Sequence, residues 1–317
     1  MSHHIRHYTS NISNITRASI VAIGNFDGLH MGHLELMNCL KSNATGLDKV
    51  VFSFCPHPTI AMSPNKEGFG LLLLSDEKRE LLNSLGIDIF IEYPFDNALR
   101  NLTAEDFVKD ILVGKLSARA VVMGSRSAFG KKRAGDVTLM RRMGTDLGFD
   151  VHEVKAVNID TEVVSSTSIR GSVLSRDLQK ACQMMTRPYQ ISGVVHQGKQ
   201  LGRTLGFPTI NICVPKEKLL PPNGVYLTKT KLPSGELAPS ITNIGTNPSV
   251  ADGVPEIHCE THIYDFNNTL YNSHVTIYFQ KHIRGEIKFA IIEDLRTQVL
   301  ADIEYGRSLI KNSHFME

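Results

Sequence analysis

Two histidines follow a glycine-bearing turn early in the chain, and their setting suits phosphate chemistry. The segment reads Ile23-Gly24-Asn25-Phe26-Asp27-Gly28-Leu29-His30-Met31-Gly32-His33. Residues 18–23 predict a buried strand, and residues 34–40 carry apolar side chains at helical spacing. A helix N-terminus after such a turn offers free N–H groups and the positive end of the helix dipole to a phosphate. His30 and His33 can then stabilise charge on a phosphoryl oxygen, and Gly28 and Gly32 give a ligand room near the backbone.

The His-x-x-His spacing alone also fits a loop whose histidines have no function, or a pair of metal ligands, although no further ligand cluster lies nearby in the sequence. A second candidate is Ser165-Ser166-Thr167-Ser168-Ile169-Arg170, where hydroxyls and a guanidinium meet at an expected helix N-terminus. Such groups bind phosphate oxygens, but an ordinary helix cap followed by a surface arginine has the same pattern. The basic, glycine-rich residues 124–136 are either a phosphate-binding loop or a solvated turn.

The second half of the chain has its own candidates between residues 202 and 266. Gly202 and Gly206 allow close approach of a phosphate to the backbone. Thr209 and Asn211 lie two apart in an expected strand, so both oxygens face one side and suit a Mg²⁺ that also takes phosphate ligands. A β-turn with a buried Thr and Asn remains the alternative. Glu260, in an otherwise apolar strand, is either a base that takes a proton from an alcohol or a partner in a cross-strand salt bridge.

The first half of the sequence predicts an alternating α/β fold. Expected strands 18–23, 49–54, 87–93, 119–123 and 151–157 alternate with expected helices at 34–40, 76–85, 104–112 and 136–147. Ser75 and Thr103 are the expected caps of the second and third of these helices. This alternation predicts a parallel sheet with helices on both faces. The histidine motif then falls at the carboxyl end of a strand, where ligands bind in such folds.

The pattern changes after residue 185. Short strands at 189–196, 208–212, 224–230, 257–266 and 275–279 predict a small barrel or sandwich, and residues 291–310 predict a helix. Residues 172–185 predict a helical linker. We therefore expect two domains, 1–185 and 186–317.

Composition narrows the class of protein further. The 317 residues are 42% hydrophobic and 21% charged, with a net charge of +2, so nothing calls for nucleic acid or a membrane surface as partner. The five cysteines are scattered and form no C-x-x-C, which predicts reduced thiols in a cytoplasmic protein. No apolar run reaches transmembrane length, and the polar residues 1–17 lack the apolar core of a signal peptide.

Taken whole, the segment from Gly24 to His33 resembles the signature of the HxGH nucleotidyltransferase superfamily, and residues 165–170 resemble its second signature. Over about residues 19–302 the chain resembles the bifunctional bacterial riboflavin kinase/FMN adenylyltransferase family, also called FAD synthetase. The further motifs that carry the resemblance are Phe54-Cys55-Pro56-His57-Pro58, Arg187-Pro188-Tyr189, Gly202 to Asn211, Asn223-Gly224-Val225-Tyr226, Asn243 to Pro248, Glu260 to Phe266 and Ile283-Arg284-Gly285-Glu286.

The resemblance implies an N-terminal Rossmann-like nucleotidyltransferase domain and a C-terminal six-stranded Greek-key β-barrel with riboflavin kinase activity. Riboflavin and MgATP would give FMN, and FMN with a second ATP would give FAD and pyrophosphate. Glu260 would be the base, Thr209 and Asn211 would hold Mg²⁺, and Arg284 would lie in a loop over the flavin. His30 and His33 would stabilise the adenylyl transition state. The implied nucleotide- and flavin-binding residues are Gly24, Asn25, Phe26, Asp27, Gly28, Ser166, Thr167, Arg170, Gly202, Arg203, Gly206 and Arg284.

One departure from the family pattern bears on function. Arg126 and Ser127 stand where the family has Asp or Asn and Phe, whereas Phe129 and Gly130 are kept. Smaller departures are Met185-Thr186 for Leu-Gly and Arg176 for Gly. Three interpretations follow: a bifunctional enzyme, a riboflavin kinase with a degenerate adenylyltransferase half, or a module that only binds a flavin or nucleotide. The intact Thr209, Asn211 and Glu260 argue against the third for the kinase half.

Overall fold

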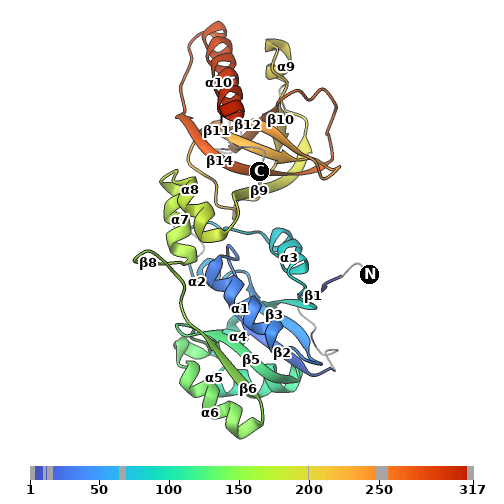
Figure 1. The fold of residues 1–317 in the computed structure, drawn as a ribbon, viewed down its shortest axis with the longest axis vertical. Coiled ribbons are helices and arrows are strands. Elements are labelled where there is room, and N and C mark those ends of the chain that lie inside the picture. The colour runs from blue at the N-terminus through green and yellow to red at the C-terminus, as the bar shows by residue number, and fades with distance from the viewer. Residues whose placement is uncertain are drawn as a thin grey trace. The chain divides into compact units, whose positions relative to one another are not determined.

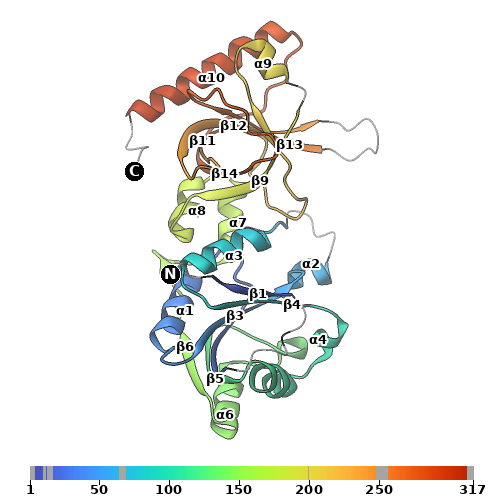
Figure 2. The same ribbon diagram turned by 90° about the vertical axis from the view of Figure 1, so that its right-hand side faces the viewer.

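The computed structural model describes residues 4–9, 12, 17–63, 69–198, 200–247 and 256–312. Pro248, which ends one of the quoted motifs, lies outside these residues. The contacts within the chain divide it into two compact units, Met1–Ser166 and Thr167–Glu317. Figures 1 and 2 show the first unit in blue to green and the second in yellow-green to red.

The first unit is built on a six-stranded sheet in which every strand pair is parallel. In spatial order the strands are β1 (Arg6–Tyr8), β4 (Ile89–Pro94), β3 (Asp48–Cys55), β2 (Ser19–Ile23), β5 (Ala118–Gly124) and β6 (Asp150–Val154). The chain runs outward from β2 through β3 to β4 and then returns to the other side of β2 as β5. The strand order therefore reverses between β2 and β5, which is where α/β sheets of this kind bind ligands. The histidine motif begins at the last residue of β2.

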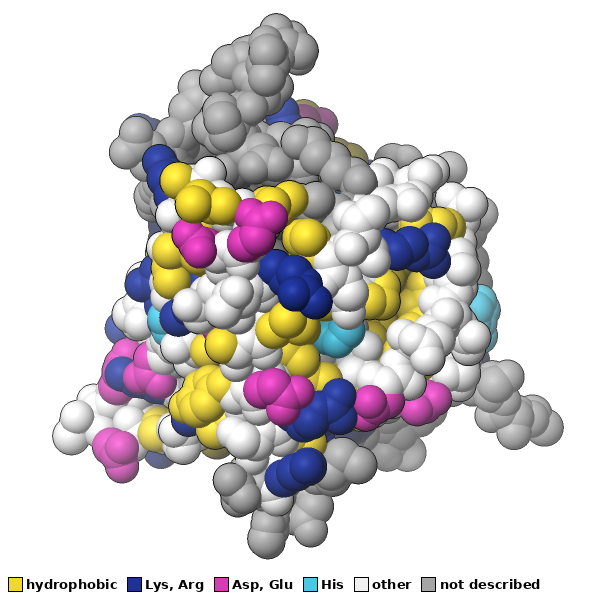
Figure 3. Space-filling model, turned by 90° about the horizontal axis from the view of Figure 1, so that it is seen from above, with side chains coloured by type: hydrophobic (Ala, Val, Ile, Leu, Met, Phe, Trp, Pro, Cys, Tyr) yellow, Lys and Arg dark blue, Asp and Glu magenta, His cyan; other side chains and the backbone are white. Residues whose placement is uncertain are grey.

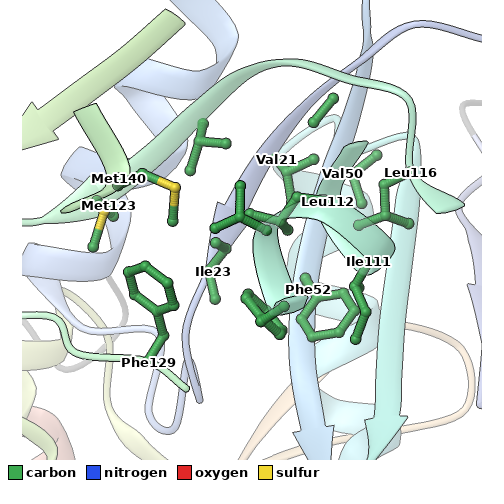
Figure 4. Packing of buried hydrophobic residues seen from close by; sticks show 14 of the residues in the cluster. Val21, Ile23, Val50, Phe52, Ile111, Leu112, Leu116, Met123, Phe129 and Met140 are labelled. Atoms are coloured by element: carbon green, nitrogen blue, oxygen red, sulfur yellow. The ribbon is translucent and has the colours of Figure 1, made fainter. Parts of the chain in front are cut away.

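Helices cover both faces of this sheet (Figure 2), as the alternating pattern predicted. On one face, α1 (Met31–Ser42) and α3 (Ser75–Ser84) pack against alternate residues such as Ala22 and Val51. On the other, the π-helix η1 (Phe107–Lys115) and α6 (Val137–Leu147) pack against Val21, Val50 and Phe52. Figure 4 shows these strand residues close to Ile111 and Leu112 of η1. The shorter elements of the unit are α2 (Pro58–Met62), α4 (Asn97–Asn101), α5 (Ala104–Asp106), η2 (Lys131–Arg133), β7 (Asn158–Ile159) and β8 (Glu162–Val163).

Of the two helix caps predicted in this unit, Thr103 is confirmed and Ser75 is wrong. Thr103 caps α5 by accepting a hydrogen bond from the Asp106 N–H at 3.0 Å, as predicted. Asp136 does the same for α6 through the Leu139 N–H. Ser75 is not the cap of α3, because it is the first residue of that helix and its hydroxyl donates instead to the buried carboxylate of Glu92.

The second unit contains a closed barrel of six antiparallel strands. They are β9 (Tyr189–His196), β10 (Ile210–Ile212), β11 (Gly224–Lys231), β12 (Leu237–Asn247), β13 (Glu256–Ile263) and β14 (His274–Gly285). The spatial order β14-β11-β12-β13 is a Greek key, as the family resemblance implied. Five of the six strands were predicted from the sequence pattern, and β12 was not. The helices of the unit are α7 (Ser166–Leu174), α8 (Leu178–Met185), α9 (Leu201–Leu205) and α10 (Ile292–Asn312).

The barrel wall has a hydroxyl-rich inner face and an apolar outer face. Thr228, Thr242 and Thr261 are fully buried, and the Thr242 hydroxyl is 2.9 Å from that of Thr228 and 2.8 Å from that of Thr261. On the other face, Ile241 joins a cluster with Ile303 of α10. The described surface in Figure 3 shows positive and negative side chains interspersed, which agrees with the low net charge. Among the described helices, none combines the length and apolarity needed to span a membrane.

Candidate active sites

The two histidines of the motif lie together at the carboxyl end of β2. His30 occupies the N-cap position of α1, and His33 lies in the first turn of that helix. Their rings stack with centroids 3.6 Å apart and planes 18° from parallel. Phe26, which is fully buried, contacts the His33 ring edge-on at 5.3 Å. The two imidazoles therefore lie together at the N-terminus of α1, where the strand order reverses between β2 and β5. A phosphate site is expected at this position.

The turn of the histidine motif, residues 24–30, contains two non-glycine residues with left-handed backbone angles. Phe26 and Leu29 have φ angles of 49° and 39°, in the left-handed region that non-glycine residues rarely adopt. A Cβ on Gly28 would lie 2.9 Å from Leu72 Cδ1, and a Cβ on Gly32 would lie 3.3 Å from His30 Cε1. The room that we expected these glycines to leave for a ligand is thus partly used by side chains of the protein itself. Gly32 matters because it makes space for the His30 ring.

Asp27 ties the motif to two other segments. Its side chain is buried, and Oδ1 accepts hydrogen bonds from the Leu72 and Leu73 N–H groups at 2.9 and 3.1 Å. Its backbone carbonyl accepts a hydrogen bond of 2.7 Å from the Ser166 hydroxyl at the start of α7. The hydrogen bond thereby joins Ser166, one residue of the second segment that the sequence singled out, to the histidine motif. Thr167 and Arg170 follow Ser166 on α7, the first exposed and the second half-buried.

The residues that depart from the family pattern lie just after β5. Arg126 is exposed in a tight turn closed by the Ser127 N–H, which donates to the Gly124 carbonyl at 2.9 Å. Phe129 is buried in the core of the first unit (Figure 4). A Cβ on Gly130 would lie 2.6 Å from the Cα of Ala104. The two kept residues therefore support the fold, whereas the two changed ones lie at the end of the strand next to β2.

In the barrel, Asn211 and Glu260 stand directly opposite each other across the β10–β13 pair, and Asn243 of β12 is the next residue in the same row. Opposed residues of an antiparallel pair share one face of the sheet. Asn211 is 8% exposed and Glu260 is half-buried. Among the described residues, the side-chain carboxylate of Glu260 makes no hydrogen bond or ion pair, so the cross-strand salt bridge is not formed there. A partly sheltered carboxylate without a counter-ion is chemically available.

A pocket opens next to this row. It is lined by Gln200, Arg203, Pro208, Thr209, Ile210, Thr261, Ile263, Phe266, Asn268, Thr269, Leu270 and Tyr271. Two of these lining residues, Arg203 and Thr209, are among the site residues predicted from the sequence. Asn211 and Glu260 do not line the pocket, although their strand neighbours Ile210 and Thr261 do. Thr209 precedes the first residue of β10, so the expectation that Thr209 and Asn211 share one face of a strand is not met.

The glycine-bearing turn predicted before Thr209 contains the short helix α9. A Cβ on Gly202 would lie 2.6 Å from the Phe207 carbonyl oxygen, and Gly206 ends the helix with a φ of 93°. The first glycine permits close packing of the segment on itself, and the second permits the left-handed cap. Both therefore have a structural reason that spacing alone does not reveal.

Arg284 does not lie in a loop, as the resemblance implied, but in β14 one residue from its end. The strand continues beyond Phe279, its expected end, because its pairing with β11 extends to Gly285. Two irregularities of register interrupt that pairing. The Arg284 guanidinium binds both carboxylate oxygens of Asp302 on α10, with contacts of 3.0, 3.0 and 2.6 Å. Asp302 was not among the predicted residues. The sequence places it within the expected helix at residues 291–310 and does not indicate that it pairs with Arg284.

Comparison with known proteins matches both halves of the chain to described families. Residues 12–168 match the FAD synthetase family and residues 185–310 the riboflavin kinase family. The bifunctional riboflavin kinase/FMN adenylyltransferase of Pseudomonas fluorescens is 34% identical over 92% of this chain and 93% of its own. The protein of that name from Escherichia coli K12 is 33% identical over 92% and 94%. A crystal structure described as a macrolide-efflux protein from Streptococcus pneumoniae superposes with a TM-score of 0.84 and 28% identity, covering 96% of this chain and 99% of that one.

Proposed function

The chain belongs to the family of bifunctional riboflavin kinase/FMN adenylyltransferases, and we propose how its residues divide the two reactions. It phosphorylates riboflavin to FMN and adenylylates FMN to FAD, so riboflavin, FMN and ATP are its ligands. The kinase reaction belongs to the barrel half and the adenylyl transfer to the parallel-sheet half. We assign the halves to residues 186–317 and 1–185, and place the enzyme in the cytoplasm, with no nucleic acid or membrane partner.

In the first half, a phosphate oxygen of FMN attacks the α-phosphorus of ATP, and pyrophosphate leaves. His30 and His33 stabilise the charge that develops on the phosphoryl oxygens. Ser166, Thr167 and Arg170 position the triphosphate, and the backbone of residues 24–28 lies beneath it. The hydrogen bond between the Ser166 hydroxyl and the Asp27 carbonyl supports the assignment of Ser166, because it joins that residue to the histidine motif.

In the second half, Glu260 accepts the proton of the ribityl 5′-hydroxyl as that oxygen attacks the γ-phosphorus of ATP, and ADP leaves. The observation that carries this assignment is the pairing of Asn211 with Glu260 across β10 and β13. Gly202, Arg203 and Gly206 border the nucleotide, since Arg203 and Thr209 line the adjacent pocket. Arg284 lies in β14 of the same barrel, where its ion pair with Asp302 fixes the guanidinium. We assign it to flavin binding.

The oxygens available in the kinase half fit Mg²⁺. Thr209 and Asn211 offer neutral oxygen donors, which suit a hard cation that keeps phosphate and water ligands. Among the described residues, no group of three or more His, Cys, Asp and Glu side chains could hold a metal by itself. Two neutral protein donors leave the other coordination positions to phosphate and water, so the cation would bind together with the nucleotide and would neutralise phosphate charge there.

A riboflavin kinase with a degenerate first half is the second candidate, because Arg126 and Ser127 replace the usual pair. One time course separates the two. Pure protein is incubated with riboflavin and MgATP, without added FMN, and the flavins are separated at intervals. Bifunctional activity gives FMN first and FAD afterwards. Accumulation of FMN with no FAD, even after FMN is supplied, would establish the degenerate half instead.

A further inference from the structure

A buried lysine lies beneath the motif turn, and the two reactions described above do not use it. The side chain of Lys78, on α3, is 8% exposed. Its Nζ lies 3.2 Å from the Asn25 carbonyl oxygen, 3.5 Å from the Ser53 hydroxyl and 3.9 Å from Glu92 Oε1. A buried ammonium group costs free energy unless charges and hydrogen bonds compensate for the lost water. Its contacts therefore show what it interacts with in the folded protein.

The first partner is the Glu92 carboxylate, whose side chain is 6% exposed. This carboxylate also contacts His7 Nε2 at 3.1 Å and the Ser75 hydroxyl. Burial lowers the pKa of Lys78, and the negative charges of Glu92 and Asp27 oppose that effect. Glu92 thus has other hydrogen-bond partners and does not depend on Lys78 alone. Charge balance accounts for only part of the arrangement.

The second partner is the motif turn itself. The Asn25 carbonyl accepts hydrogen bonds from Lys78 Nζ and, at 3.1 Å, from the Ser53 hydroxyl. Because a peptide group is planar, fixing this oxygen fixes the orientation of the whole Asn25–Phe26 peptide. Phe26 follows with its unusual φ of 49° and contacts the His33 ring. Strained residues of this kind persist only where the surroundings hold them.

We infer that Lys78 is a positioning residue of the adenylyltransferase, acting through the Asn25 carbonyl to hold the turn that orients His30 and His33. The inference rests on the proposed role of these histidines. The segment leading into α3 is attached to the same turn a second time, through Asp27 and the N–H groups of Leu72 and Leu73. α3 and the segment leading into it therefore contact the turn on both sides of Phe26, at Asn25 and at Asp27.

The test separates this role from charge balance. Lys78→Met removes the ammonium, and the double variant Lys78→Met/Glu92→Gln also removes the carboxylate that the first change leaves unbalanced. Ser53→Ala removes the other donor to Asn25 and leaves Glu92 intact. Lys49→Met is the matched control, because Lys49 of β3 pairs with Asp88 and does not contact the turn. Each variant is assayed with supplied FMN and ATP at a temperature at which circular dichroism shows it folded, and its riboflavin kinase rate serves as the internal reference.

We expect both Lys78 variants to lower kcat for FAD formation about tenfold or more, since small misplacements of catalytic groups are costly. KM should change less, because the displaced groups act on the transition state. Ser53→Ala should lower kcat in the same direction and be less than additive with Lys78→Met, since both act through one carbonyl. The kinase rate should stay within about twofold, and Lys49→Met should match the wild type in both activities, as expected for groups that touch neither site.

Recovery of wild-type FAD formation in the double variant would overturn the inference, because Lys78 would then only balance Glu92. Unchanged kcat in Lys78→Met would overturn it as well. His33→Ala, measured alongside, distinguishes this failure from a failure of the proposed function. If His33→Ala leaves FAD formation intact, the assigned role of the histidines is wrong. If it abolishes FAD formation while the Lys78 variants do not change it, only the inference on Lys78 is wrong.

Discussion

Arg284 of the barrel and Asp302 of α10 form a bidentate ion pair in which the carboxylate is 6% exposed, with Gln298 Nε2 donating to the same carboxylate at 2.9 Å. This contact fixes the guanidinium of a residue that we assign to flavin binding. We predict that Asp302→Asn raises the KM for riboflavin several-fold, because Arg284 loses the group that orients it. The free energy of unfolding should fall by roughly 3–5 kcal/mol, since one partner of a buried pair is left without its counter-ion.

The control for this variant is a second ion pair that involves the same helix. Arg307 of α10 pairs with Asp265, whose side chain is 77% exposed. Exposed pairs of this kind contribute little to stability, so Asp265→Asn should leave both the melting temperature and the kinase KM unchanged. Steady-state kinetics and thermal melts of the two variants provide the comparison. If they behave alike, the Arg284–Asp302 pair has no special role.

The second prediction concerns Arg126 and Ser127, at the turn after β5. We expect FAD formation to persist in the wild type, because His30, His33 and Arg170 are all present. The double change Arg126→Asp/Ser127→Phe restores the usual residue types and should lower the KM for FMN or ATP more than it changes kcat. Initial rates of FAD formation from supplied FMN measure this. Identical KM and kcat in both proteins would mean that these positions do not touch substrate.

The third prediction concerns where the halves separate. α8 packs on β9 and β14 of the barrel and buries Leu178, Ala181, Met184 and Met185. We expect fragments 167–317 and 186–317 both to phosphorylate riboflavin. The longer one should melt at a higher temperature, because burying a large apolar side chain stabilises by about 1.5–3 kcal/mol. An inactive 186–317 beside an active 167–317 would show that the helices belong to the folded kinase and that the boundary near residue 185 is wrong.

The alternation of strands and helices and the position of the histidine motif followed from the sequence because hydrophobic periodicity reports burial directly. β12 was missed for a physical reason. Its inward residues Ser240 and Thr242 carry hydroxyls that hydrogen-bond to Thr228 on the neighbouring strand β11, so the buried side of the strand shows no apolar pattern. β1 is a polar three-residue edge strand, Arg6–Tyr8, and too short to give a pattern.

The buried charges were the least predictable feature of the candidate sites. Lys78 stands in the run Asp76-Glu77-Lys78-Arg79-Glu80, which is typical of a solvated helix face. Only the tertiary structure shows that Lys78 contacts the Asn25 carbonyl, 53 positions earlier in the chain, and Glu92, 14 positions later. Arg284 shows a similar limit, since the partner that fixes it lies on another element of the fold.

The assignment of one reaction to each site is tested most directly by measuring both reactions in each of two single variants. Glu260→Gln keeps the size of the side chain and removes the base, and His33→Ala removes one of the stacked imidazoles. We predict that Glu260→Gln lowers FMN formation about a hundredfold or more and leaves the conversion of supplied FMN to FAD near the wild-type rate. We predict the reverse for His33→Ala, with FAD formation falling about a hundredfold and FMN formation unchanged. Loss of both activities in either variant, or of neither, would contradict the assignment of one reaction to each site.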